Sequence, residues 1–211
     1  MCSSDLVERK DAQGNDVEYH QNIEFHTQQV GGEFVLQPGA VYNVPFALEV
    51  PWETPVTMFL GRHLTGMNVG VTTELQIARA VDNGDLDPVN VHPLPAQEAL
   101  LDAFGRLGFR FHGADLEKGT IRGTRQRLPF YQEIEFRSPE QYKGLKEVEL
   151  SFVSDGHEMD VVLEMDKKPG LFSGGDTYRS FVMSMQSYQQ TDWADYLHQW
   201  LHEVGGKRNW F

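Results

Sequence analysis

The stretch from residue 74 to 95 most constrains how this chain can fold, because it changes character twice within one short segment. It begins with apolar side chains that favour burial and becomes acidic and turn-forming at Asp82. It ends with three prolines, Pro88, Pro93 and Pro95. Each proline fixes its own φ and pushes the preceding residue toward extended backbone, so this tail is predicted to be stiff and non-helical. Residues 82–95 are therefore predicted to cross between two β-rich halves.

The acidic part of the crossing also suggests a cation site. Oxygen ligands for a hard cation would come from Asp82, Asn83, Asp85 and Asp87. The spacing is not that of an EF-hand loop, because Gly84 is misplaced and no distal Glu completes the set. We therefore interpret these carboxylates as solvated turn residues and assign no metal ligand. The residues assigned to an interdomain linker are Asp82, Asp85, Asp87 and Pro88.

Charge and composition exclude several function classes. The 211 residues carry a net charge of −13, which opposes binding to nucleic acid or to an anionic lipid surface. A single cysteine, Cys2, excludes an intrachain disulfide and a thiolate metal cluster, as is typical of a reducing compartment. No apolar run approaches the ~20 residues of a membrane helix. We expect a cytoplasmic protein that neither binds nucleic acid nor spans a membrane.

The first six residues, Met1–Leu6, share no pattern with the chain from Val7 onward. The run Cys-Ser-Ser-Asp-Leu is also the translation of a common sequencing-adapter fragment, so we exclude it from the fold prediction. We expect the leading strands of the first domain to be missing before Val7, together with any targeting segment.

Most of the remaining chain shows the alternation of half-buried strands. Tyr42, Val44, Phe46, Leu48 and Val50 would share one face of a strand, with Pro45 at an edge or a bulge. Further strands are predicted over 17–26, 56–60, 67–71, 109–111, 132–136 and 178–185. Asp155-Gly156 predicts a hairpin between the runs at 148–152 and 161–165.

Two amphipathic helices are predicted. The first follows Pro95 and ends at Gly108, which suits a left-handed stop. The second runs from Asp192 to Val204, with Asp192 or Thr191 as its N-cap. Its apolar stripe either packs on the second domain or contacts a partner. The candidate partner-contact residues are Trp193, Leu197, Trp200 and, in the tail, Trp210.

No arrangement of reactive side chains indicates catalysis. His198 and His202 lie four apart on a helix but lack the Glu of a zincin motif and a third ligand. The paired carboxylates Glu133 and Glu135, like Glu147 and Glu149, would lie on outward strand faces, where carboxylates are normally solvated. No nucleophile elbow, phosphate loop or dinucleotide motif is present. We assign no catalytic residue, cofactor-binding residue or metal ligand, and expect a chain that is not an enzyme.

Several stretches, in one order along the chain, resemble the bacterial sporulation-control SpoOM family. These are Pro45–Thr57, Leu75–Asp82 with Asp85 and Asp87-Pro88, Pro93–Pro95, Leu107–Phe109 and Leu128–Glu133. The resemblance extends from Gly31 to about Met165 and does not cover Gln186–Phe211. It implies an arrestin-like architecture of two β-sandwiches and a non-enzymatic regulator.

The expected fold is therefore mainly β, with two arrestin-like sandwiches joined by a short crossing. The boundaries are an incomplete first sandwich over 7–81, the linker over 82–95, a second sandwich with its terminal helix over 96–204, and a tail over 205–211. The expected function is that of a regulator or scaffold that binds other proteins. The alternative is a small-ligand or glycan-binding β-sandwich module that depends on a cation.

Overall fold

The computed structural model describes residues 2–10, 16–35, 37–74, 85–167 and 177–205. Within these ranges the chain is mainly β. The strands are β1 (Cys2–Lys10), β2 (Asp16–Glu24), β3 (Met58–Phe59), β4 (Arg62–His63), β5 (Val69–Thr73), β6 (Asp85–Val89), β7 (Arg110–Lys118), β8 (Phe130–Arg137), β9 (Leu145–Ser154), β10 (Glu158–Lys167) and β11 (Thr177–Ser184). The helices are α1 (Pro95–Arg106) and α2 (Trp193–Gly205), with 3-10 turns at Glu140–Tyr142 and Tyr188–Gln190.

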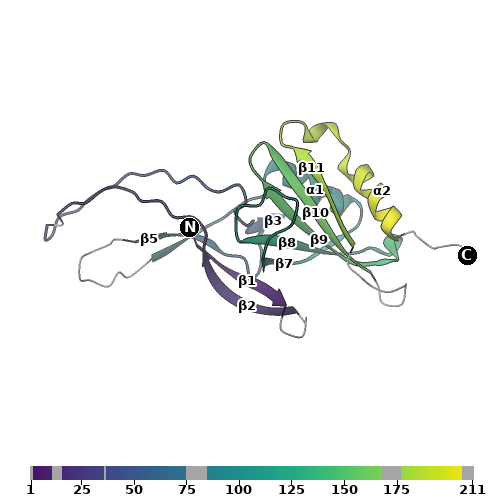
Figure 1. The fold of residues 1–211 in the computed structure, drawn as a ribbon, viewed down its shortest axis with the longest axis horizontal. Coiled ribbons are helices and arrows are strands. Elements are labelled where there is room, and N and C mark those ends of the chain that lie inside the picture. The colour runs from purple at the N-terminus through teal and green to yellow at the C-terminus, as the bar shows by residue number, and fades with distance from the viewer. Residues whose placement is uncertain (1, 11–15, 36, 75–84, 168–176, 206–211) are drawn as a thin grey trace, which may run out of the picture.

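One large sheet organises these strands. Its order is β11-β10-β9-β8-β7-β1-β5-β6. Strand β2 lies outside this order and pairs with β1. Strands β3 and β4 form a separate short pair. Among the described residues the pairs are antiparallel except for β1 and β7, which run parallel at Val7 and Leu116. In Figure 1, β1 and β2 extend away from the part of the sheet that β7–β11 build.

The larger apolar core lies between this sheet and the two helices. Phe104 of α1 stacks on Phe136 of β8, with ring centroids 4.9 Å apart. Leu197 and Leu201 of α2 are fully buried in the same core. An ion pair between Arg106 and Asp192, 3.2 Å long, links the two helices at the surface. Each fully buried side chain of this size stabilises the fold by about 1.5–3 kcal/mol, so both helices are held mainly by their apolar faces.

A second apolar cluster lies farther along β7 and β8. It contains Val56, Leu64, Met67, Ala114, Leu116 and Phe130. The segment that supplies Val56 is fixed to β8 by two hydrogen bonds. The Val56 amide donates to Gln132 Oε1 at 2.9 Å, and Gln132 Nε2 donates to the Val56 carbonyl at 2.8 Å. Phe59 packs against both clusters, so the two cores are contiguous.

The predicted helices and the predicted hairpin are confirmed. Helix α1 starts at Pro95, and Gly108 ends it with φ +83°. Helix α2 is capped by Asp192 Oδ1, which accepts a hydrogen bond from the Ala194 amide at 3.1 Å. Strands β9 and β10 pair antiparallel around Gly156, whose φ is +89°.

The predicted strand over residues 42–50 is wrong. Residue 36 lies outside the described residues. None of the other residues from 27 to 57 is assigned to a strand. Tyr42, Val44, Phe46 and Val50 are all exposed, at 43–53% of their full accessible area. The alternation is present, but no neighbouring strand among the described residues pairs with it. Extended residues form a ladder only when a partner strand accepts and donates their hydrogen bonds.

Two stretches outside the predicted strands also belong to the sheet. Residues 2–6, excluded from the fold prediction, belong to β1 and pair with β2 and β5. Strand pairing joins backbone groups, so it does not require an apolar pattern in the side chains. Asp85–Val89, predicted as crossing linker, forms β6 and pairs with β5 from Asp85↔Thr73 to Val89↔Val69. Pro88 is accommodated there because β6 is the last strand in the order of the sheet.

No helix in the described part of the chain has the length and apolarity needed to cross a membrane.

Candidate functional site

The face of the sheet opposite the helices carries a buried polar row. Asp115 of β7 pairs in register with Glu133 of β8, which pairs with Ser151 of β9. Their exposed fractions are 3%, 8% and 3%. The interpretation of Glu133 and Glu147 as solvated outward carboxylates is therefore wrong, since Glu147 is also only 6% exposed.

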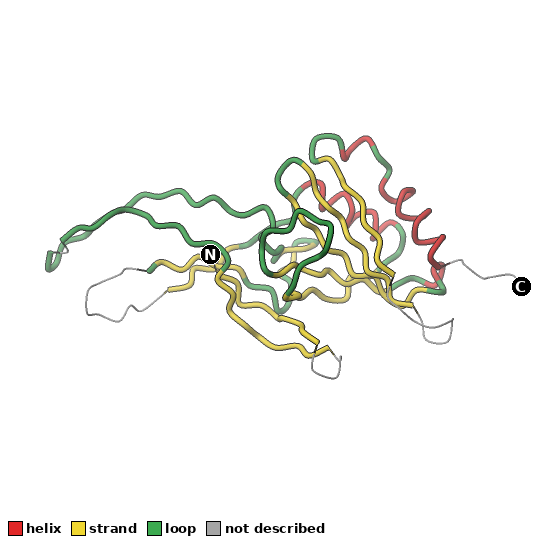
Figure 2. The backbone as a smooth tube through the Cα atoms, in the orientation of Figure 1, coloured by secondary structure: helices red, strands yellow, loops and turns green. Residues whose placement is uncertain are grey.

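The connection between β7 and β8, residues 119–129, covers this row and is called the cover loop. In Figure 2 this loop crosses in front of the sheet. Arg125 fixes it: its backbone amide donates to Asp160 Oδ2 at 2.8 Å, and its guanidinium reaches Asp160 at 2.9 Å, Glu158 at 2.9 Å and Asp155 at 3.2 Å. The three carboxylates raise the pKa of Arg125 further above its ordinary value. The loop therefore keeps water from a face that its strands alone would leave open.

The register places like charges directly opposite one another. Glu149 pairs with Glu135 on one side and with Glu164 on the other. Glu133, Glu149 and Glu164, here called the carboxylate cluster, bring one oxygen each to within 4.8 Å of one another. Like charges opposite each other destabilise a sheet when both are ionised.

Burial and mutual repulsion both favour the protonated carboxyl groups. Burial first, and then the carboxylates of Glu149, Asp115, Glu117 and Glu164, raises the pKa of Glu133 to about 10. Burial first, and then Glu164 and the neighbouring acidic residues, raises the pKa of Glu149 to about 8. Burial also raises the pKa of Tyr131 beside them. Strongly shifted groups of this kind mark candidate functional sites.

A hollow of about 450 Å³ opens between the cover loop and the sheet. From the loop it is lined by Thr120, Ile121, Arg122 and Thr124. From the sheet it is lined by Tyr131, Glu133, Ser151, Val162, Glu164, Tyr178, Arg179 and Ser180. The Tyr178 hydroxyl donates a hydrogen bond to Glu164. The polar groups of the lining are therefore hydroxyls, carboxyls and the guanidinium groups of Arg122 and Arg179.

A second acidic group lies on the same sheet, at His112, Glu135 and Glu147. Here protein cations are already present. Arg137 pairs with Glu147 at 2.9 Å, Lys146 pairs with Glu147 at 3.6 Å, and Arg137 Nη2 lies 2.6 Å from His112 Nε2. Arg137 and Lys146 therefore pair with the carboxylate of Glu147.

A second candidate surface is the long extended segment 27–50, here called the arm. Figure 2 shows its two limbs running out together from the body. Gln28 Nε2 donates to the Ala47 carbonyl at 3.0 Å, and the rings of Phe34 and Tyr42 lie 5.0 Å apart. At its described tip, the Ala40 amide donates to the Gln37 carbonyl. Among its described residues, the arm thus follows the course of a hairpin but forms no β-ladder.

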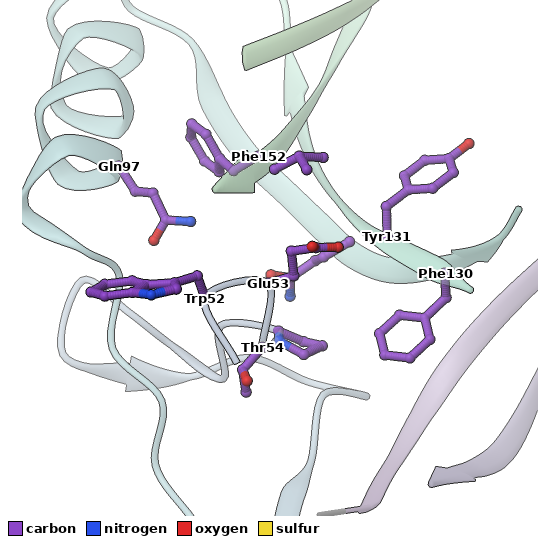
Figure 3. A pocket seen from close by; sticks show the side chains of 10 residues that line it. Trp52, Glu53, Thr54, Gln97, Phe130, Tyr131 and Phe152 are labelled. Atoms are coloured by element: carbon purple, nitrogen blue, oxygen red, sulfur yellow. The ribbon is translucent and has the colours of Figure 1, made fainter. Parts of the chain in front are cut away.

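The arm is anchored to the body at its second end. Glu53 accepts hydrogen bonds from the backbone amides of Arg127 at 2.9 Å and Leu128 at 3.1 Å. Figure 3 shows Trp52, Glu53 and Thr54 at this seam beside Tyr131 and Phe130. Its cavity of about 10 Å³ holds at most one water molecule, so the seam is a packing contact.

The candidate partner-contact residues of α2 are mostly turned inward. Leu197 is 0% exposed, which leaves its side chain no surface for a partner in this conformation. Trp193 and Trp200 are partly buried and pack on Phe181, with centroids 5.5 and 5.3 Å from its ring. This is the packing that the core interpretation of α2 predicts. Trp210 lies outside the described residues.

The predicted linker residues do not gather into a site among the described residues. Asp82 lies outside the description, while Asp85, Asp87 and Pro88 are spread along β6. His198 accepts or donates a hydrogen bond with the Tyr142 hydroxyl at 2.7 Å, which explains its position on α2 without a metal.

Sequence reasoning missed the carboxylate cluster, although a signal for it was present. The hairpin predicted at Asp155-Gly156 fixes the register of its two strands, and that register sets Glu149 opposite Glu164. Burial of Glu133 had no such signal, because it depends on where the cover loop lies.

Comparison with known proteins gives a consistent result. The profile of the SpoOM protein family matches residues 3–169. The sporulation-control protein spo0M of Bacillus subtilis (strain 168) is 34% identical over 156 residues, which cover 73% of this chain and 57% of that protein. The chain therefore spans little more than half the length of this curated relative.

A solved structure shares the fold as well. The crystal structure of Spo0M, sporulation control protein, from Bacillus subtilis matches with a TM-score of 0.77 at 27% identity. The match covers 96% of this chain and 82% of that one. The resemblance noted from the ordered motifs is thus confirmed, and the chain belongs to the SpoOM family of bacterial sporulation-control proteins.

Proposed function

We propose that this protein is a cytoplasmic, non-enzymatic regulator that acts by binding another protein through its arm. The observation that carries the proposal is the exposure of large apolar side chains along the arm. They are Val30, Phe34, Val35, Val41, Tyr42, Val44, Phe46 and Val50, each 37–86% exposed. Exposed apolar side chains gathered on one segment are typical of protein interaction sites.

The proposed architecture is the arrestin-like pair of β-sandwiches that the family resemblance implies. The two apolar clusters support it. One lies under α1 and α2, and the other lies between the segment 56–67 and the far ends of β7 and β8. In this proposal the arm extends from the first β-sandwich and lies beside the second.

The proposed mode of binding is strand addition by an extended segment of the partner. Among the described residues of the arm, the only backbone–backbone hydrogen bond is the one from Ala40 to Gln37. Apart from the Ala47 and Val35 carbonyls and the Gln37 amide, which bond to side chains, the arm's described backbone groups are available to a new strand, and the alternation at 42–50 offers one apolar face. Main-chain hydrogen bonds then supply affinity, and the alternate side chains supply specificity.

Site-specific photo-crosslinking in the source bacterium tests this proposal. A photoreactive phenylalanine analogue replaces Phe46 in the full chain, and the matched control carries it at Val182, which is 55% exposed on β11. We expect a discrete protein adduct from position 46 and none from position 182. Equal labelling at both positions, or none at position 46, would overturn the proposal. The mass of the adduct distinguishes a different protein from a second copy of this chain.

One observation favours a second function, the binding of a small ligand. The hollow under the cover loop has a volume within the usual range of ligand pockets, about 300–1,000 Å³. Its lining combines apolar side chains with hydroxyl, carboxyl and guanidinium groups, as is typical of such pockets. Calorimetry with mono- and oligosaccharides would separate this candidate from the first, since strand addition predicts no heat.

A further inference from the structure

The carboxylate cluster has the dimensions of a cation site. Its three glutamates come from three adjacent strands, β8, β9 and β10, and their nearest oxygens lie within 4.8 Å of one another. Calcium–oxygen distances of 2.3–2.6 Å allow two ligand oxygens of one ion to lie up to about 5 Å apart, so the three oxygens are close enough to share one Ca²⁺ ion. Three protein carboxylates favour Ca²⁺, since Mg²⁺ is usually held by one or two carboxylates and keeps several waters.

A separate observation indicates that the cluster lacks a ligand. Glu133 is 8% exposed and lines the hollow, yet no described residue donates a hydrogen bond to its carboxyl group or forms an ion pair with it. Glu149 likewise has no ion pair with a described Lys or Arg. Buried acidic groups are normally paired or coordinate a metal, because the isolated charge is costly to remove from water. Arg122 and Arg179 also line the hollow, but neither pairs with Glu133 or Glu149.

The hollow itself can complete a coordination sphere. Calcium takes 6–8 oxygen ligands, and three glutamates supply at most part of them. The Ser151 hydroxyl lies in register between Glu133 and Val162, and the hollow has room for several water molecules. Water and hydroxyl ligands are therefore available beside the carboxylates.

The second acidic group is a poorer candidate. At His112, Glu135 and Glu147 a metal would have to compete with Arg137 and Lys146, which already pair with Glu147. It would also need a nitrogen ligand, which hard cations such as Ca²⁺ disfavour. Glu147 of the second group is thus already paired with protein cations, whereas Glu133 and Glu149 form no ion pair with a described Lys or Arg.

We propose that Glu133, Glu149 and Glu164 bind one Ca²⁺ ion beneath the cover loop. The ion links β8, β9 and β10 through their side chains and replaces the repulsion between facing glutamates with coordination. The site is independent of the arm, so this proposal stands or falls separately from the proposed function.

Isothermal titration calorimetry of the full chain with CaCl₂, at about pH 8 where carboxylates compete better against protons, tests the proposal. We expect one saturable site, and a loss of affinity of about tenfold or more in both E133Q and E149Q, because each removes one charged ligand. Glu203 is an exposed residue of α2, so E203Q is the matched control and should bind as the unaltered chain does.

A second measurement guards against variants that fold poorly. Terbium, a luminescent probe for calcium sites, should be excited through Tyr131 and Tyr178, which both line the hollow. We expect its emission to rise with the unaltered chain and with E135Q, and to be lost in E133Q. No saturable heat with the unaltered chain, or binding that is lost in E135Q and kept in E133Q and E149Q, would overturn the proposal.

Discussion

Two stretches of this chain carry the same alternating pattern, but only one of them forms a strand. Residues 42–50 alternate apolar and polar side chains, as do residues 148–152. The second stretch lies in β9 between β8 and β10, and Val148 and Leu150 are 0% exposed. The first lies in the arm, where Val44 is 45% exposed and no described strand pairs with it.

The difference between the arm and β9 separates two conditions for strand formation. Alternation makes a segment fit to bury one face, but a ladder needs partner strands and the buried face needs a core. Both stretches satisfy the first condition, and only β9 satisfies the second. Four predictions test this contrast, in order of decreasing effect on the free energy of unfolding.

The largest effect is expected from shortening a core side chain of β9. Leu150→Ala should lower the free energy of unfolding by about 3 kcal/mol, because it leaves a cavity in the larger core. The matched change in the arm, Phe46→Ala, should alter it by less than about 0.5 kcal/mol. Urea unfolding followed by circular dichroism measures both. Comparable losses would show that the arm is packed in solution.

The next effect concerns pH and the carboxylate cluster beside β9. The pKa of Glu133 is raised to about 10 and that of Glu149 to about 8, so the folded chain binds more protons than the unfolded chain above about pH 4.5. The contribution of these two groups to stability is therefore greatest below about pH 4.5 and is lost as the pH rises, up to about pH 8 for Glu149 and about pH 10 for Glu133.

Glu133→Gln removes one of these protonation differences. In a chelator-containing buffer at pH 7 we expect this variant to be more stable than the unaltered chain by about 2 kcal/mol, with a shallower pH dependence. Unfolding in urea at several pH values checks both expectations. A variant that is less stable at every pH would mean that Glu133 is held by a favourable contact.

Two glycines provide the third test, since both have positive φ. Gly156 in the β9–β10 turn has φ +89°, and an added Cβ would lie 2.5 Å from the Trp52 ring. Gly39 in the arm has φ +75° and open space around it. Gly156→Ala should cost about 2 kcal/mol, and Gly39→Ala at most about 1 kcal/mol. Thermal unfolding measures the loss of stability in both variants. A larger loss from Gly39→Ala would show that the turn in the arm, and not the β9–β10 turn, is the more tightly ordered one.

The smallest effect is expected from proline in the arm. Because Asn43 donates no ladder hydrogen bond in this structure, Asn43→Pro should change the free energy of unfolding by about 0.5 kcal/mol or less. Urea unfolding again gives the value. A loss of several kcal/mol would show that the arm forms a ladder in solution.

The features that sequence predicted correctly are those decided by neighbouring residues. Pro95 and Gly108 bound α1 through their own backbone preferences, and Asp192 caps α2 through its own side chain. Asp155-Gly156 sets the β9–β10 hairpin because only a few residues separate the paired strands. In each case the deciding interaction lies within the reach of one turn.

The features that sequence missed depend on distant parts of the chain. Glu133 is buried because the cover loop is held by Arg125 to residues of β10 and its turn. Asp85–Val89 is a strand because β5 lies beside it, although Pro88 argues against a central strand. The alternation at 42–50 fails to form a strand for the opposite reason, the absence of a described neighbour.

The place of β1 in the sheet has a consequence for how the chain acquires its fold. Strand β1 can pair with β2 soon after both leave the ribosome, but its other edge is completed only when β5 and β7 have been synthesised. Contacts between segments so far apart in sequence form slowly, and an open edge can recruit other chains during the delay. Newly made molecules should therefore be most prone to aggregation before β7 emerges, and chaperones that shield strand edges should raise the yield of folded protein.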